Sequence, residues 1–158
     1  MQLKTNNIGK TFSGVNVLRK VNFDLKPGEV HALVGENGAG KSTFVKILSG
    51  VYTPTEGNIF LDEKKVDITS PIVAQKNGVS LIHQEPQSFS HLSVAENIFM
   101  GHMEGNNFSR VKWQDINKKS NDILESIGLK IDPKIIMEGL SIADQQMIEI
   151  AGALSKNS

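Results

Sequence analysis

The stretch "GENGAGKST", residues 35–43, decides the fold class of this chain. It fits the pattern Gly-x-x-x-x-Gly-Lys-[Ser/Thr], with Gly35 as its first residue and Ser42 as its last. The preceding "EVHALV", residues 29–34, is rich in aliphatic and β-branched residues and predicts a buried strand, and a helix is expected to begin near Lys41. A strand, a glycine-rich loop and a helix in this order predict a phosphate-binding loop.

The residue types in this loop suit a phosphate. Glycines let successive backbone N–H groups point inward as an anion-binding nest, and the following helix adds its positive dipole end. Lys41 would reach the β and γ phosphates, and the Ser42 hydroxyl would ligate Mg²⁺, which prefers oxygen donors. The alternative is a glycine turn that caps an ordinary helix. The expected nucleotide-binding residues of the loop are Gly35, Glu36, Asn37, Gly38, Ala39, Gly40, Lys41, Ser42 and Thr43.

Composition excludes several classes. The 158 residues include 17 basic and 17 acidic side chains and no cysteine, so neither a field favouring nucleic acid nor a disulfide framework is expected. No basic and apolar targeting signal opens the chain, and no apolar run approaches the roughly 20 residues that cross a bilayer. These features predict a cytoplasmic protein that reaches a membrane only through a partner.

Strand and turn signals dominate before residue 84. Short strands are expected between Gln2 and Val34, with turns at "SGVN" and "KPGE". The segment "GNIFLDEKKV", residues 57–66, predicts two strands about a polar turn, and "VSLI", residues 79–82, predicts another buried strand. Between them, "SPIVAQKNG" predicts a short helix with Ser70 as its N-cap.

Helix signals take over after residue 84. Ser93 and Glu96 form a capping-box pattern, and "VKWQDINKKSNDILESIG", residues 111–128, predicts an amphipathic helix. Ser141 and Asp144 repeat the capping pattern before the last helix. The apolar stripe expected on that helix consists of Met147, Ile150, Ala151 and Leu154.

Several stretches together resemble the N-terminal part of an ATP-binding cassette (ABC) transporter ATPase: "GVNVL", the 35–43 loop, "IHQEP", "LSVAENIFMG" and "QQMIEIAGALS". They look most like importers of ribose, galactose or xylose, with a weaker likeness to autoinducer-2 importers. The resemblance implies an α/β fold: a P-loop NTPase (RecA-like) core with an antiparallel β layer and an α-helical subdomain. The implied domains are a core lobe at 1–85, the helical subdomain at 86–150 and a return to the core at 151–158.

The resemblance implies three further site residues. Phe12 matches an aromatic residue that stacks on adenine, although composition alone favours a core position for it. Gln84, in "LIHQEP", matches a glutamine that reaches Mg²⁺ and the attacking water; an isolated Gln is otherwise a common loop residue. Ser141 matches the signature segment that grips ATP on an opposing cassette. Here "LSIAD" replaces the family's "LSGGQ", and a merely capped helix also explains Ser141.

The implied function is an ATP-binding subunit that couples ATP hydrolysis to sugar uptake at the cytoplasmic face of the membrane. The implied cofactors are ATP and Mg²⁺, with Lys41 and Gln84 as the catalytic residues. The implied partners are a transmembrane permease, a second cassette and, indirectly, a sugar-binding protein, with no nucleic acid. Residues 87–102, which include Phe89, Leu92, Phe99 and Met100, are expected to dock the permease.

Hydrolysis in the family also uses a strand that ends in Asp-Glu, the Walker B strand, and a later histidine. Both follow the signature helix, and this chain ends at Ser158 before them, so an incomplete sheet and little hydrolysis are expected. Two other classes stay open: a soluble P-loop kinase or GTPase, and a non-catalytic nucleotide-binding module. No guanine-selecting Asn-Lys-x-Asp is present, which favours the transporter.

Overall fold

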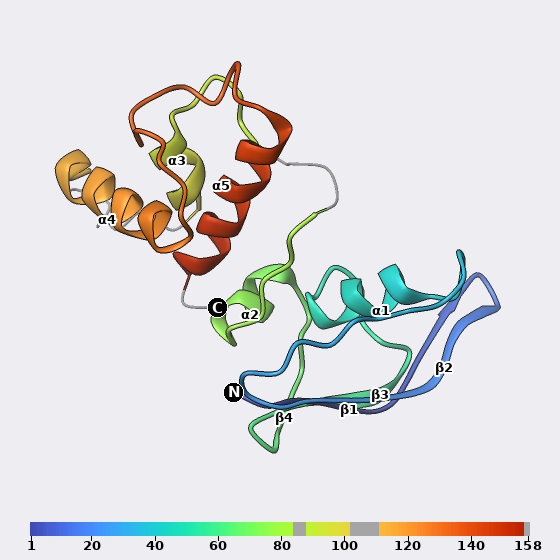
Figure 1. Ribbon diagram of the computed structural model, residues 1–158. Coiled ribbons are helices and arrows are strands. Elements are labelled where there is room, and N and C mark those ends of the chain that lie inside the picture. The colour runs from blue at the N-terminus through green and yellow to red at the C-terminus, as the bar shows by residue number, and fades with distance from the viewer. Residues whose placement is uncertain (84–87, 102–110, 157–158) are drawn as a thin grey trace. The chain divides into compact units, whose positions relative to one another are not determined.

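The computed structural model describes residues 1–83, 88–101 and 111–156 and divides the chain into two compact units, Met1–Leu81 and Ile82–Ser158 (Figure 1). Each unit has its own hydrophobic core. The first unit contains a sheet and two helices, and the second is helical. Each unit is described by itself below.

The first unit is built on a four-stranded antiparallel sheet in the order β2-β1-β3-β4. Two-residue turns join its hairpins: Ser13 and Gly14 have φ of 46° and 83°, and Asp62 and Glu63 have φ of 46° and 63°. Positive φ at both turn positions matches the twist of adjacent strands. The predicted antiparallel layer is confirmed. Its strands are β1 (Leu3–Phe12), β2 (Val15–Leu25), β3 (Glu56–Leu61) and β4 (Lys64–Val66).

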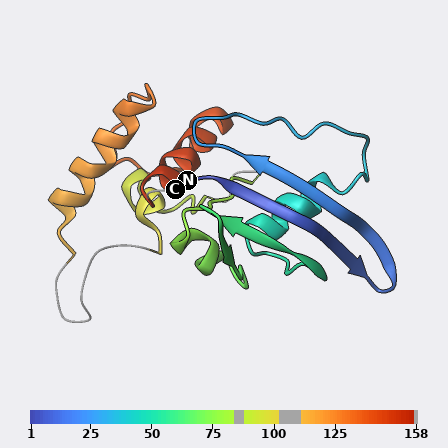
Figure 2. The ribbon, with the colours of Figure 1, turned by 90° about the horizontal axis from the view of Figure 1, so that it is seen from below.

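Two short helices, α1 (Lys41–Leu48) and α2 (Pro71–Lys76), lie on one face of this sheet (Figures 1 and 2). The hydroxyl of Ser70 accepts a hydrogen bond from Val73 N at 3.4 Å, which confirms the predicted N-cap of α2. Apolar side chains of both helices pack against the strands and form the core of the unit. That core consists of Ile8, Leu18, Phe44, Ile47, Ile59, Ile68 and Ala74.

Two predicted buried strands are wrong. Residues 29–34 form no strand, and Val30 and Val34 are 97% and 91% exposed. Residues 79–82 also form no strand, and Ile82 is 43% exposed. A strand needs hydrogen-bond partners along its edges, and neither segment forms a ladder with another strand in the described part of the chain. Apolar composition alone therefore did not make a strand at either place.

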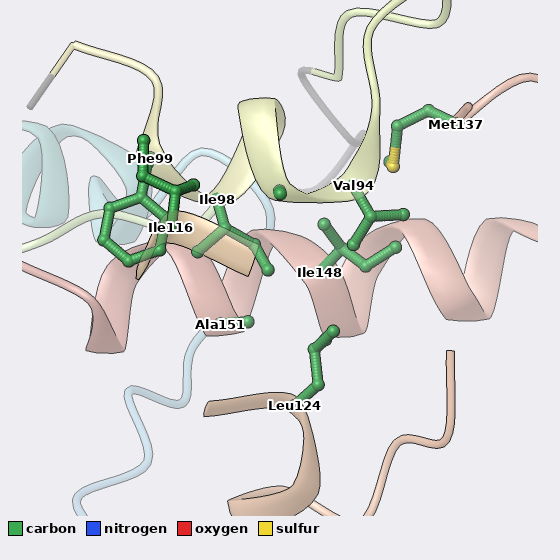
Figure 3. Close-up of a cluster of buried hydrophobic side chains, with 9 residues drawn as sticks. Val94, Ile98, Phe99, Ile116, Leu124, Met137, Ile148 and Ala151 are labelled. Atoms are coloured by element: carbon green, nitrogen blue, oxygen red, sulfur yellow. The ribbon is translucent and has the colours of Figure 1, made fainter. Parts of the chain in front are cut away.

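The second unit packs three helices around one core (Figure 3). These are α3 (Val94–Phe99), α4 (Trp113–Ser126) and α5 (Ile142–Leu154). The capping box at Ser93 and Glu96 is confirmed, because the Ser93 hydroxyl accepts from Glu96 N and the Glu96 carboxylate accepts from Ser93 N. The buried core consists of Val94, Ala95, Ile98, Phe99, Ile116, Leu124, Met137, Ile148 and Ala151.

The apolar stripe of α5 differs from the prediction. Ile148 and Ala151 are the buried residues, whereas Met147 and Ile150 are half-buried and Leu154 is 45% exposed. Apolar or small residues make up nine of the 13 positions of this helix and occur on several sides of it, so its 3.6-residue period does not single out one face. Ile98 of α3 and Leu124 of α4 pack on the side that carries Ile148 (Figure 3).

Candidate functional site

The 35–43 loop turns sharply before α1. Ala39 N donates to the Glu36 carbonyl at 3.2 Å, and Gly38 at the third position of this turn has φ of 84°. Gly40 has φ of 88° and is the N-cap residue, and Phe44 N donates to its carbonyl at 2.9 Å as the helix begins. The predicted order of glycine loop and helix is therefore confirmed.

Gly40 also lies directly against β2. A Cβ on this residue would be 2.6 Å from Leu18 Cδ2 and 3.1 Å from the Val17 carbonyl oxygen. A Cβ on Gly38 would meet nothing within 4 Å. Both glycines need the left-handed backbone, but only Gly40 also needs the space. The loop is thereby held against the hairpin of β1 and β2.

The side chain of Lys41 folds back across the loop. Its Nζ donates hydrogen bonds to the carbonyls of Gly35 at 2.7 Å and Glu36 at 2.8 Å. An ammonium has three donors, so this arrangement keeps a positive charge at the loop with donor capacity for an anion. The carbonyls of the loop thus hold the Lys41 ammonium beside the backbone that would bind a phosphate.

The first turn of α1 suits an anion as well. The first N–H groups of a helix have no partner inside the helix, and no side chain in the described chain caps this end. No acidic residue lies in the first turn, so nothing there opposes a negative ligand. Ser42 is exposed and Thr43 is half-buried at the same end. Backbone N–H groups, the helix dipole and Lys41 therefore act at one place.

Phe12 lies at the end of β1 and is 37% exposed. Its ring meets the Tyr52 ring edge-on, with centroids 5.1 Å apart and an interplanar angle of 73°. The Nζ of Lys10 lies over the Phe12 ring, 5.0 Å from its centroid. The side chain is outside the core of the first unit, contrary to the core alternative, and it is partly exposed to solvent.

Gln84 lies outside the described residues, so its predicted role remains a prediction. The flanking residues are both hydrogen-bonded to α5. His83 N donates to Glu149 Oε1 at 3.3 Å, and Ser88 Oγ donates to Gln145 Oε1 at 3.2 Å. The two acceptors are four residues apart and lie on one side of the helix.

Ser141 is the N-cap of α5 and belongs to the second unit. Its Oγ accepts from Asp144 N at 3.1 Å and donates to Asp144 Oδ2 at 2.7 Å. Only one arm of the predicted capping box is present, because in the described contacts the Asp144 carboxylate bonds the Ser141 hydroxyl and not its backbone. Ser141 thus has a structural role, and Asp144 places a negative charge beside it.

The one Asp-Glu pair in the sequence, Asp62–Glu63, follows the apolar β3 but has no part in this site. It forms the β3–β4 turn, where Asp62 Oδ1 accepts from Gln2 N at 2.7 Å. Leu3 pairs with Leu61 at that end of the sheet, whereas Lys10 pairs with Leu18 beside Gly40. Seven residues of strand separate the two places, roughly 20 Å at the usual rise.

Metal binding at the loop would depend on few protein ligands. Within the described ranges, no three His, Cys, Asp or Glu side chains are grouped to hold a metal ion. Mg²⁺ is commonly held by one or two protein oxygens together with phosphate oxygens and water, so the exposed Ser42 hydroxyl fits that chemistry.

No helix in the described part of the chain has the length and apolarity to span a bilayer.

The residues around Phe12 were not predicted. Phe12, Tyr52 and Lys10 together form what we call the aromatic cluster. Tyr52 lies 40 positions from Phe12 in the sequence. No periodicity or motif marks such a pair. Phe99, in contrast, was predicted to face a partner but is 8% exposed and belongs to the second core, so that prediction is wrong.

The glycine-rich loop and the helix that begins at Lys41 are those of a P-loop nucleotide-binding protein. The sequence profile of the ABC transporter family matches residues 18–158, and the chain belongs to this family. It is 48% identical to the ribose import ATP-binding protein RbsA 1 of Agrobacterium fabrum over 97% of its own length. It is 44% identical, over the same share, to RbsA 2 of Streptomyces avermitilis. The chain spans about 30% of the length of these relatives.

Solved cassettes have the same fold. A nucleotide-free ATP-binding cassette from an ABC transporter superposes with a TM-score of 0.84 at 26% identity, covering 99% of this chain and 66% of that one. The cbiO1 protein of Clostridium perfringens, part of an ABC transporter complex, gives 0.79 at 29% identity, covering 98% and 61%. These similarities confirm the predicted family and the P-loop NTPase fold class.

Proposed function

We propose that this chain is part of the ATP-binding subunit of an ABC importer, which couples ATP binding and hydrolysis to sugar uptake. The observation that carries the proposal is the 35–43 loop with Lys41 placed across it, in a chain 44–48% identical to ribose import ATP-binding proteins. Membership of the ABC family favours this function over a soluble kinase or GTPase.

The nucleotide would lie along the first unit. Its base would stack on Phe12, and its phosphates would lie in the loop from Gly35 to Thr43, against the N-terminus of α1. Lys41 has donor capacity beyond its two loop carbonyls and would use it to contact β- and γ-phosphate oxygens, a charge-assisted contact. Ser42, together with Gln84, would hold Mg²⁺, which neutralises phosphate charge when bound.

The partners follow from the same proposal. The subunit would work at the cytoplasmic face of the membrane with a permease and a second cassette, and indirectly with a sugar-binding protein. Ser141 would meet the nucleotide of the opposing cassette. Its hydroxyl bond to Asp144 would have to be shared or broken for that contact. The sugar would be selected by the partners, so this chain itself would bind no free sugar.

Titration calorimetry with Mg²⁺ and each of ATP, ADP, GTP, ribose, galactose and xylose tests the function. We expect ATP and ADP to bind and the three sugars to show no heat. Direct binding of a sugar would indicate a sugar kinase, and absence of ATP binding would contradict the proposal. Nucleotide binding without turnover in the assembled transporter would favour the non-catalytic module.

A further inference from the structure

The aromatic cluster around Phe12 joins the two parts of the first unit that the proposed nucleotide would contact. Phe12 lies on the β1–β2 hairpin, and Tyr52 follows α1, the helix of the phosphate loop. Their rings are 5.1 Å apart at 73°, which is the edge-to-face geometry that aromatic pairs prefer. Tyr52 is half-buried, while Phe12 is 37% exposed.

Tyr52 is held from the side of the helix. Val51 N and Tyr52 N both donate to the Lys46 carbonyl in the last turn of α1, at 2.9 and 3.1 Å. The Nζ of Lys46 also lies 5.6 Å from the centroid of the Tyr52 ring. The position of this ring is therefore set by the end of the helix that begins at the loop.

The segment after Tyr52 is tied to β1. Thr55 N donates to the Gly9 carbonyl at 2.9 Å, and Thr11 N donates to Thr55 Oγ1 at 3.1 Å. Lys10 Nζ donates to the Thr53 carbonyl at 2.6 Å. These bonds are made by the three residues that precede Phe12 on its strand. They connect the backbone that carries the Phe12 ring to the segment that follows Tyr52.

Lys10 has a second contact. Its Nζ lies over the Phe12 ring at 5.0 Å and 5.9 Å from the Tyr52 centroid, within the range of a cation–π interaction. Lys10 and Phe12 are two residues apart on β1 and so share a face of the strand. Because Lys10 lies over the Phe12 ring, a base would stack on the part of the ring that remains exposed.

We infer that Tyr52 and Lys10 are positioning residues that hold the Phe12 ring ready for a nucleotide base. The inference rests on the proposed function, since it assigns Phe12 to the base of the same nucleotide. Neither residue needs to touch the phosphates. Losing either ring contact lets Phe12 adopt other rotamers, and stacking then costs the entropy of ordering the ring again.

The test compares Mg-ATP with inorganic tripolyphosphate, which has the phosphates but no base. Tyr52→Leu should weaken ATP binding roughly threefold to tenfold and leave tripolyphosphate binding within about twofold. Tyr52→Phe keeps the ring and should match the wild type with both ligands. Lys10→Met keeps the apolar stem and should show the same selective loss, smaller in size.

Tryptophan fluorescence measures the environment and mobility of the side chain at position 12 without any ligand. Trp113 is the single tryptophan, so Phe12→Trp in a Trp113→Phe background places one indole at this site. Adding Tyr52→Leu should shift its emission to the red and lower its anisotropy, whereas adding Tyr52→Phe should change neither. Melting temperatures of all variants show whether each one is folded.

Four results would overturn the inference. The first two are an unchanged ATP affinity in Tyr52→Leu and an equal loss of affinity for ATP and tripolyphosphate in that variant. The third is a loss of ATP affinity in Tyr52→Phe as large as in Tyr52→Leu. The fourth is an indole emission that does not respond to the change at Tyr52. Failure of the proposed function looks different, because the wild type would then bind neither ligand. That result would remove the inference together with the function.

Discussion

Gly40 packs against Leu18 so closely that a Cβ on the loop residue would be 2.6 Å from Leu18 Cδ2, and the leucine would have to shift to admit it. The phosphate-type loop is therefore fitted to the neighbouring hairpin as well as to its own helix. Gly38 provides a matched comparison, because it has the same left-handed backbone in open space.

We predict that Gly40→Ala is more destabilising than Gly38→Ala. Both changes cost about 1 to 2 kcal/mol for a left-handed non-glycine residue. Gly40→Ala adds an overpacking cost of about 1 to 3 kcal/mol because the new methyl group meets Leu18. Urea unfolding followed by circular dichroism measures the difference, and equal losses would show that β2 does not constrain the loop.

The stability of the second unit should vary with pH because of Glu96. Hydrogen bonds from the Ser93 hydroxyl at 2.6 Å, and next from the Ser93 backbone N–H at 2.8 Å, lower the pKa of Glu96 below its usual value. A lowered folded-state pKa means that the charged form stabilises the fold above about pH 4.3. That stability is lost as the pH falls through the folded-state pKa.

Glu96→Gln should therefore reduce stability at pH 7 by about 0.5 to 1 kcal/mol. The difference from the wild type should shrink as the pH falls below about 4. Asp122→Asn, at an exposed carboxylate of α4, is the control and should follow the wild-type curve. If the stability of Glu96→Gln and of the wild type changed in parallel with pH, Glu96 would not be the source of this pH dependence.

Phe89 is an exposed aromatic side chain on a fixed backbone. Its N–H donates to Asn97 Oδ1 at 2.8 Å, its carbonyl accepts from Asn97 Nδ2 at 3.1 Å, and the residue is 54% exposed. In the proposed transporter, Phe89→Glu should weaken association with the permease by about 2 kcal/mol or more. ATP affinity should not change. Sugar uptake by reconstituted complexes measures this effect, with Ile72→Glu as a control at another exposed apolar residue. Undiminished uptake in Phe89→Glu would place the contact elsewhere.

Much of the fold was predictable because its signals are local. The turns at Ser13–Gly14 and Asp62–Glu63 and the caps at Ser70 and Ser93 each depend on neighbouring backbone groups. Short-range hydrogen bonds of this kind can be read from a few adjacent residues. The loop and the start of α1 belong to the same group.

The failed predictions concern partners distant in sequence. Residues 29–34 have strand composition, but a strand also requires another strand to pair with. The buried face of α5 is the one that packs against Ile98 and Leu124. The periodicity of the α5 sequence gives no information about these partners. The pairing of Phe12 with Tyr52 depends in the same way on how β1 and α1 meet.

Turnover by residues 1–158 alone should be very low. The family resemblance places the Asp-Glu strand and the later histidine after the signature helix, and loss of one such group typically costs about 10² to 10³ in rate. Phosphate release by a monodisperse preparation, beside Lys41→Ala, measures this. Lys41-dependent turnover near 1 per second, an ordinary enzyme rate, would mean that these residues contain a complete catalytic set.

The central claim, that the 35–43 loop holds a nucleotide through Lys41, is tested most directly by equilibrium binding of Mg-ATP. Lys41→Ala removes a charge-assisted contact worth about 1.5 to 3 kcal/mol, so affinity should fall roughly 10-fold to 150-fold. Lys64→Ala, which removes an exposed charge on β4, should leave the affinity within about twofold. Equal affinities for Lys41→Ala and the wild type would contradict the account.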